Sequence, residues 1–245
     1  MPIDSTTIVL LRHGQSVGNL IDQQLIKDDA TDFPLDLLSR GDAEWPLTDL
    51  GLQQAERAGS YLRSAFPGGF DHIFCSPFIR SQQTLAALQI GKGLLEPRIK
   101  EQNWGALNGP EMLLKIDERH TFERAYASNI DLRPPEGETV REVHARLLSF
   151  WSERQSLITS RKTLIVSHWA PLFLSRMILN KLPLTDFPSA YMLKREVLNC
   201  QIDMYSSQIN SSGGPAGWWA RSTCLEHDSH ASYPWQQMHD RQTLV

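Results

Sequence analysis

The chain has 245 residues, 41% of them hydrophobic and 21% charged, which is ordinary for a globular protein with one sizeable domain or two small ones. A net charge of −4 and a pI near 6.1 exclude a nucleic-acid binder with a broad basic surface, and no apolar run has membrane-spanning length. Three scattered cysteines and the absence of a signal-peptide pattern predict a cytoplasmic location.

Apolar runs of strand length alternate with segments of helical periodicity along the chain. Strands are expected, in chain order, at 7–11, 70–77, 96–100, 162–168 and 196–205. Helices are expected at 46–66, 81–88, 111–127, 139–157 and 171–182. This alternation predicts an α/β domain with a mostly parallel central sheet.

Two helix starts carry capping signals. Thr48 is the expected N-cap of the helix over 46–66. Thr139 and Glu142 have the spacing of a capping box, in which the side chain of each residue accepts a hydrogen bond from the backbone N–H of the other. They begin the longest expected helix.

The sequence suggests one domain over 1–205 and a C-terminal extension over 206–245 that packs on the same domain. Composition shifts at the start of this extension to a linker-like stretch rich in serine and glycine. Within the domain, an irregular insertion is expected over about 20–46, with a helical turn near 35–38. Its aspartates, which include Asp42, favour a solvated loop over a metal site.

Polar side chains repeatedly follow the expected buried strands. The residues concerned are Arg12 and His13, Ser76 and Arg80, and Ser167 and His168. Ligands of α/β sheets bind outside the carboxyl ends of the strands, so these residues are expected to meet in one crevice. Two arginines and two histidines would make a positive pocket suited to phosphate, because guanidinium groups match phosphate oxygens bidentately.

The two histidines could instead ligate a metal, but neither lies in an HxH or HExxH spacing. Bound phosphate favours phosphoryl transfer, in which a neutral imidazole attacks phosphorus and arginines stabilise the charge. A carboxylic acid must then protonate the leaving oxygen, and Glu101, in the loop after the third expected strand, is the candidate. The sequence lacks a CxxxxxR loop, which disfavours a cysteine phosphatase.

The stretch LLRHGQSVGN resembles the LxRHGxSxxN signature of the histidine phosphatase superfamily, the phosphoglycerate mutase-like proteins, and more specifically of its phosphatase-type branch. Five further segments resemble family motifs: PLTDLGLQQA, SPFIRSQQT, EQNWGALNG, PPEGETVREVHARL and LIVSHWAPL. Together the resemblance covers about residues 7–180. It implies a three-layer α/β/α sandwich and an enzyme without a metal or other cofactor.

The resemblance also implies residue roles. His13 would be the phosphorylated nucleophile, and Glu101 would donate and accept the proton. Arg12, Arg80 and His168 would hold the transferred phosphoryl group.

Four further residues are candidates for substrate binding. The resemblance places Ser16 and Asn19 at the rim of the phosphate site, and Gln102 follows the candidate acid. Trp169 stands where the family has glycine after its second histidine. Its indole either lines the substrate pocket, where it could stack on a flat or apolar substrate, or points into the core.

Two departures distinguish the chain from the mutases of the family. Mutases place an arginine after the catalytic glutamate and a pair of arginines in the next helical region, where this chain has Gln102, and Glu123 with Arg124. An anion in place of a cation disfavours a doubly charged substrate.

The favoured function is therefore hydrolysis of a small phosphorylated metabolite through a phosphohistidine. A phosphoglycerate mutase-type phosphotransferase is the alternative, and an inactive binding protein on the same fold is an alternative of another class. The expected partner is the small phosphorylated substrate, with no nucleic acid and no membrane. The sequence leaves the oligomeric state open, with a homodimer as one option.

Overall fold

The computed structural model describes residues 5–26, 41–108, 121–122, 124–192, 197–209, 215–224, 231–232 and 236–237. Its strands are β1 Thr7–Arg12, β2 His72–Cys75, β3 Leu94–Leu95, β4 Lys162–Ser167, β5 Ile202–Ile209, β6 Pro215–Cys224, β7 Ala231–Ser232 and β8 Gln236–Gln237. Its α-helices are α1 Val17–Ile26, α3 Asp49–Ala65, α4 Ile79–Leu88, α7 Val140–Ile158, α8 Trp169–Leu179 and α9 Phe187–Met192. Short 3-10 helices are η1 Asp42–Glu44, η2 Pro97–Ile99, η3 Gly105–Asn108 and η4 Leu184–Asp186.

The strands form one sheet in the order β3-β2-β4-β1-β5-β6-β7, with β8 paired to β6. The part from β3 to β1 is parallel, and the pairings from β1 through β5 to β6, β7 and β8 are antiparallel. The predicted parallel centre is thus present at β3, β2, β4 and β1. Because β1 and β4 are adjacent and parallel, their carboxyl ends lie side by side, with Arg12 opposite Ser167.

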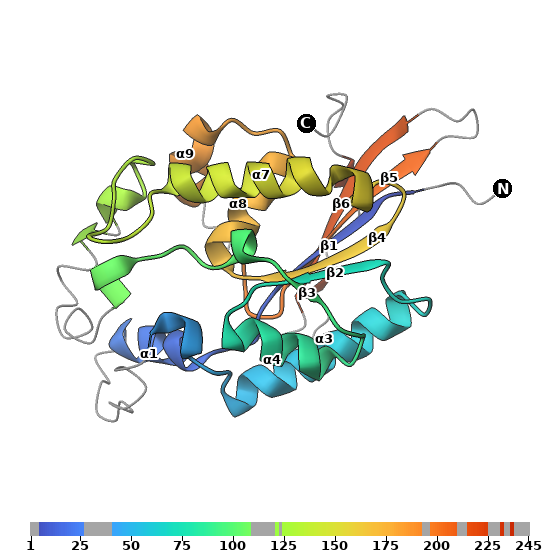
Figure 1. The fold of residues 1–245 in the computed structure, drawn as a ribbon, viewed down its shortest axis with the longest axis horizontal. Coiled ribbons are helices and arrows are strands. Elements are labelled where there is room, and N and C mark those ends of the chain that lie inside the picture. The colour runs from blue at the N-terminus through green and yellow to red at the C-terminus, as the bar shows by residue number, and fades with distance from the viewer. Residues whose placement is uncertain are drawn as a thin grey trace.

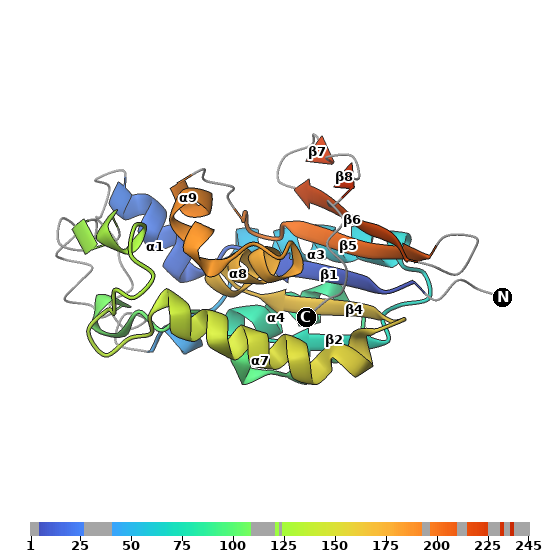
Figure 2. The same ribbon diagram turned by 90° about the horizontal axis from the view of Figure 1, so that it is seen from above.

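Helices cover both faces of the sheet, as Figures 1 and 2 show: α7 and α8 lie on one face, and α3 and α4 on the other. Side chains of β1 alternate between these layers. Ile8 and Leu10 pack in the cluster that holds the α7 and α8 side chains, whereas Val9 and Leu11 pack against α3 and α4. This arrangement is the expected three-layer α/β/α sandwich, and it explains why the strand is apolar on both faces.

The helix starts behave as their capping signals predict. The Thr48 hydroxyl accepts a hydrogen bond from Gly51 N and caps α3. Thr139 and Glu142 form the reciprocal capping box at the start of α7. In the part of the chain that the structure describes, no helix is long and apolar enough to cross a bilayer.

Three expected elements differ in the structure. The strand expected at 196–205 is β5, which begins at Ile202, and the described residues 197–201 before it are not strand. Residues 20–26, expected to be irregular, belong to helix α1, because the Ser16 hydroxyl accepts from Asn19 N and caps that helix. The strand expected at 96–100 is instead the short β3 followed by η2, where Pro97 supplies a helical φ and the Glu96 carboxylate accepts from Arg98 N.

Other expectations fall partly or wholly outside the described residues. The helical turn near 35–38 lies outside them. Of the helix expected at 111–127, residues 121–122 and 124–127 are described, with 121–122 and 124–126 as helix and 127 as a turn. The domain boundary suggested at residue 205 lies inside β5, which pairs with β1 on one side and with β6 on the other.

Candidate active site

The polar strand ends meet where the sequence predicts. The carboxyl ends of β1, β2 and β4 are neighbours, because β4 pairs in parallel with both β1 and β2. His13 N bonds Ser167 O at 3.0 Å, and the rings of His13 and His168 lie edge to face with centroids 5.0 Å apart. Both histidines are buried at the same edge of the sheet.

The contacts of His13 define which ring nitrogen can react. Nδ1 lies 2.7 Å from the carbonyl oxygen of Gly14, which can only accept, so Nδ1 carries the proton and Nε2 holds the lone pair. Nε of Arg80 donates to that Nε2 at 3.2 Å. Burial, followed by the charges of Arg80 and Arg12, lowers the pKa of His13 well below its ordinary value of 6.5. His13 is therefore a neutral imidazole with its nucleophilic nitrogen toward the arginine.

The two site arginines are held from different elements. Arg80, in the first turn of α4, is buried, and its Nη1 forms an ion pair with Asp42 at 3.0 Å. Arg12, at the end of β1, donates through Nη1 to the backbone oxygen of Val197. Thr84 connects the segment after β1 with the segment after β2. Its hydroxyl accepts from Gly14 N at 3.1 Å and donates to Arg80 O at 2.7 Å.

His168 precedes α8, and its Nε2 faces two serine hydroxyls. Ser76 Oγ lies 2.6 Å and Ser81 Oγ 3.3 Å from this nitrogen. Burial, the charge of Arg80 and then that of His13 lower the pKa of His168 well below 6.5, so this ring is neutral as well. Its buried Nδ1 has no hydrogen-bond partner among the described residues.

Glu101 lies at the N-terminus of α8, the helix that follows β4. Its Oε1 accepts from Gln102 N at 2.9 Å and Ala170 N at 3.2 Å, and its Oε2 accepts from Trp169 N at 3.2 Å. These donors favour the carboxylate. Burial outweighs the bond from Gln102 N and raises the pKa of Glu101 above its ordinary value of 4.5. The group is thus suited to carry a proton closer to neutral pH than a solvated glutamate.

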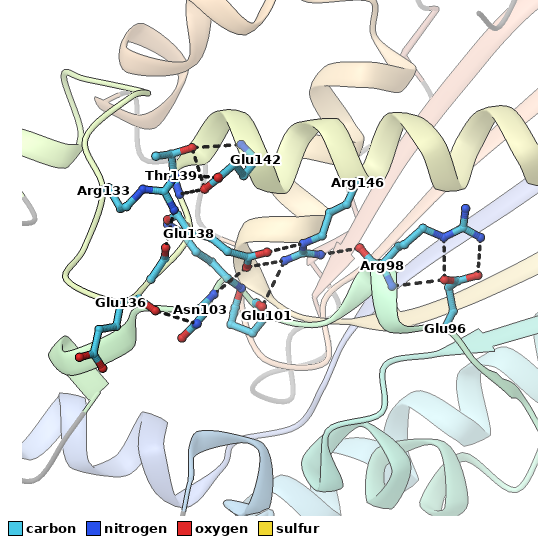
Figure 3. A network of polar contacts seen from close by, with 12 residues as sticks. Glu96, Arg98, Glu101, Asn103, Arg133, Glu136, Glu138, Thr139, Glu142 and Arg146 are labelled. Carbon is cyan, nitrogen blue, oxygen red and sulfur yellow. Dashed lines mark hydrogen bonds and ion pairs between the residues drawn. The ribbon is translucent and has the colours of Figure 1, made fainter.

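The loop that carries Glu101 is fastened to α7 by a polar network (Figure 3). Arg146 donates to the backbone oxygens of Glu101 and Arg98, and its Nε forms an ion pair with Glu138 at 3.1 Å. The carboxylate of Glu138 in turn accepts from Asn103 N at 2.9 Å. Arg146 therefore contacts the backbone of the catalytic candidate itself and of Arg98, three residues before it.

Gln102 and Trp169, both expected at the substrate, face protein neighbours. The Gln102 side chain is fully buried, donates to Glu138 O at 2.7 Å and accepts from the Tyr126 hydroxyl. Trp169 is partly buried, stacks on Phe173 with ring centroids 5.2 Å apart, and packs against the core cluster. The contact of Trp169 with Glu101 is made by its backbone N–H.

Ser16 and Asn19, expected at the rim of the phosphate site, form hydrogen bonds that hold the first loop, the segment between β1 and α1. Asn19 Oδ1 accepts from Ser16 N, from the Ser16 hydroxyl and from Asn199 Nδ2, at 3.1–3.2 Å. Asn199 Nδ2 also lies 3.1 Å from the His13 carbonyl oxygen. These bonds connect α1 with the segment before β5 through the backbone of His13.

Several site contacts carried no interpretable signal in the sequence. Thr84 and Ser81 lie on the helix that was expected after Arg80, and Asn199 near the last expected strand, but nothing in their spacing indicates a contact with the first loop. The expectation of a solvated loop is wrong for Asp42, whose side chain is 17% exposed and bound to Arg80. Within the described ranges, no group of three His, Cys, Asp or Glu residues is arranged to hold a metal ion.

The fold and the site define an α/β protein whose parallel strands end at one edge that carries two histidines and two arginines. A model of the histidine phosphatase superfamily (branch 1) matches residues 8–210, and the chain belongs to this superfamily. The family resemblance predicted from the sequence is thereby confirmed.

Curated relatives of this chain are named as mutases. The chain is 29% identical over 211 residues to a 2,3-bisphosphoglycerate-dependent phosphoglycerate mutase of Methylocella silvestris, covering 77% of this chain and 93% of the relative. It is 30% identical over 191 residues to the protein of the same name from Azorhizobium caulinodans, covering 71% and 82%.

Similar solved structures include phosphatases. A mycobacterial glucosyl-3-phosphoglycerate phosphatase superimposes with a TM-score of 0.64 at 20% identity, covering 88% of this chain and 97% of that one. A phosphoserine phosphatase of Entamoeba histolytica, solved with 3-phosphoglyceric acid, gives 0.60 at 20% identity, covering 86% and 94%. At these identities the likeness establishes the shared fold.

Proposed function

We propose that this protein hydrolyses phosphomonoesters of small metabolites through a phosphohistidine formed on His13. The observation that carries the proposal is the state of this side chain. Its Nδ1 is tied to the Gly14 carbonyl, and its Nε2 lone pair lies beside the Arg80 guanidinium in a buried site. A neutral imidazole with a fixed tautomer beside an anion-binding cation is suited to attack phosphorus.

The first chemical step would form a bond from His13 Nε2 to phosphorus and break the bond from phosphorus to the ester oxygen. Arg12, Arg80 and His168 border the position of the transferred group, where the guanidinium groups stabilise its oxygens. The leaving alkoxide needs a proton, and the protonated carboxyl of Glu101 supplies it.

The second step would return the enzyme to its starting state. The Glu101 carboxylate accepts a proton from water as the water oxygen attacks phosphorus, and the bond to His13 breaks. Phosphate leaves, His13 regains its lone pair, and Glu101 is protonated again. No metal takes part in this scheme, because the two arginines neutralise the phosphoryl charge.

Hydrolysis is favoured over mutase activity by the residues that replace the mutase cations. Gln102 is neutral and buried, with both ends of its amide bonded to protein neighbours. Arg124 is exposed and donates to the Thr121 hydroxyl, and Glu123 lies outside the described residues. The mutase names of the curated relatives make phosphotransfer between phosphoglycerates the second candidate function.

Three assays on the purified wild-type protein test the proposal. We expect phosphate release from p-nitrophenyl phosphate and from members of a panel of phosphorylated metabolites, with little interconversion of 3- and 2-phosphoglycerate. Rapid acid-free quenching should trap an acid-labile phosphoenzyme. Efficient interconversion of the phosphoglycerates with negligible hydrolysis would establish the mutase alternative instead.

We also propose that the protein works in the cytoplasm on a soluble phosphorylated substrate. The odd number and scattered positions of its cysteines support a reducing compartment.

A further inference from the structure

A second carboxyl group, in addition to that of Glu101, reaches the site from outside the strand ends. Asp42, in η1, places Oδ1 3.0 Å from Nη1 of Arg80, and its backbone oxygen accepts from the same nitrogen at 2.6 Å. Its Oδ2 accepts from Nδ2 of Asn108 at 3.2 Å. The side chain is only 17% exposed, so water screens its charge weakly.

The edge of the guanidinium that Asp42 approaches matters for substrate binding. Nε and Nη2 of an arginine form one fork, and Nη1 lies on the opposite side of the group from Nε–H. In Arg80, Nε points to His13 Nε2 and Nη1 to Asp42, and Nη2 has no partner among the described residues. Asp42 thus fixes the arginine from behind without occupying the fork directed at His13.

Asp42 also borders the loop of the candidate acid. Asn108, its amide partner, ends the segment that begins at Glu101. Burial raises the pKa of Glu101, and the negative charge of Asp42 raises it further by a smaller amount. Asp42 contacts both Arg80, which would hold the phosphoryl group, and Asn108 in the loop of the candidate acid. Because that acid must contact the leaving oxygen, we place the carboxylate of Asp42 near the leaving-group side of the site.

We infer that Asp42 is a specificity-determining residue that favours phosphomonoesters with an uncharged, hydroxyl-bearing leaving group over those whose leaving group carries a carboxylate or second phosphate. The inference rests on the proposed hydrolysis and names its substrate class. An anionic leaving group would be repelled by Asp42, whose charge is held in a weakly screened position. A polyol or sugar leaving group meets no such repulsion and can donate hydrogen bonds to the carboxylate.

The test compares two substrates that differ in one group. Glycerol 3-phosphate and 3-phosphoglycerate share a three-carbon skeleton, and a hydroxymethyl group in one replaces the carboxylate of the other. We would measure kcat/KM for both with the wild type, with Asp42→Asn and with Glu44→Gln. Glu44 is a matched control, because it is exposed on the same 3-10 helix and its substitution removes the same charge.

The ratio of the two kcat/KM values is the readout, so a general loss of activity through Arg80 does not obscure it. We expect Asp42→Asn to shift the ratio toward 3-phosphoglycerate by about fivefold or more, and Glu44→Gln to leave it unchanged. An unchanged ratio in a folded Asp42→Asn protein overturns the inference. If that variant does not fold, Asn108→Asp decides, because a second anion beside Asp42 should shift the ratio toward glycerol 3-phosphate, and an unaltered ratio overturns the inference.

Failure of the proposed function is recognised separately. Wild-type protein that hydrolyses neither substrate nor p-nitrophenyl phosphate contradicts the hydrolase proposal itself. Wild-type protein that hydrolyses them with a ratio insensitive to Asp42 and Asn108 contradicts only the role of Asp42.

Discussion

Nε of Arg80 lies 3.2 Å from Nε2 of His13 and donates a hydrogen bond to it. Because a guanidinium in a protein only donates, this bond requires a lone pair on Nε2. The Gly14 carbonyl oxygen requires the proton on Nδ1. Two independent neighbours therefore impose the same neutral tautomer on His13, and the arginine that would hold the phosphoryl group already lies at the atom that would receive it.

This pairing predicts the acid limb of the pH profile. Attack requires neutral His13, and burial, Arg80 and Arg12 lower its pKa well below 6.5, so protonation should inactivate the enzyme only well below that pH. We expect kcat/KM for p-nitrophenyl phosphate, corrected for substrate ionisation, to stay level down through pH 6.5. In Arg80→Met the limb should move toward higher pH, since a lowering charge is removed. A wild-type limb at or above pH 6.5 would contradict the neutral, buried nucleophile.

Replacement of His13 tests the covalent step directly. His13→Ala should lose the acid-labile phosphoenzyme and about 1,000-fold or more of the hydrolysis rate, because the substitution removes the imidazole that would form the intermediate. His144→Ala, a histidine of α7 outside the site, is the control and should keep both. Circular dichroism checks that the variants are folded, and turnover retained in folded His13→Ala would assign the nucleophile elsewhere.

The role of Glu101 should depend on the leaving group. An alkyl phosphate needs a proton on its leaving oxygen, whereas p-nitrophenolate leaves without one. Glu101→Gln should therefore slow hydrolysis of an alkyl phosphate by about 100-fold or more and that of p-nitrophenyl phosphate by about tenfold or less. The raised pKa of Glu101 places the loss of its proton above pH 4.5, so alkyl phosphate hydrolysis should fall as the pH rises through that raised value. Equal slowing of both substrates would show that Glu101 is not the acid.

The convergence of the strand ends could be predicted from the sequence because it follows from local patterns. Apolar runs identify buried strands, parallel strands end at one edge, and the residues after each strand must meet there. Arg12, His13, Arg80 and His168 were thus predictable as one group, and the family signature added their expected roles.

The remaining contacts depend on tertiary pairings that no local pattern encodes. Gly14 and Thr84 are 70 residues apart, and Arg80 and Asp42 are 38 apart. Asp42 is one of several aspartates in its segment, and only the folded chain distinguishes it from the others. Gln102 follows Glu101 directly, but its side chain is buried and bonds Tyr126 and Glu138, which the sequence does not indicate.

Thr84 should be needed for both stability and activity. Valine at this position preserves shape but leaves the Gly14 N–H buried without its acceptor, so Thr84→Val should lower the free energy of unfolding by about 2 kcal/mol. It should also reduce kcat/KM, since it releases Arg80 from the first loop. Thr163→Val is the matched control, because the buried Thr163 hydroxyl has no partner in the described part of the chain. Chemical denaturation of both variants measures the difference, and equal stability losses would refute the proposed bridge.

Arg146 should act as a positioning residue for Glu101. It donates to the backbone of the Glu101 loop and pairs with the partly buried Glu138, so Arg146→Gln should lower the free energy of unfolding by about 2 kcal/mol. Looser placement of Glu101 should reduce kcat for alkyl phosphates more than it raises KM, and should affect p-nitrophenyl phosphate less. Arg141→Gln is the control on the same helix, because Arg141 pairs with Asp131 at an exposed site and its loss should change neither stability nor turnover measurably. If Arg146→Gln slows both kinds of substrate to the same extent, Arg146 supports the fold without positioning the acid.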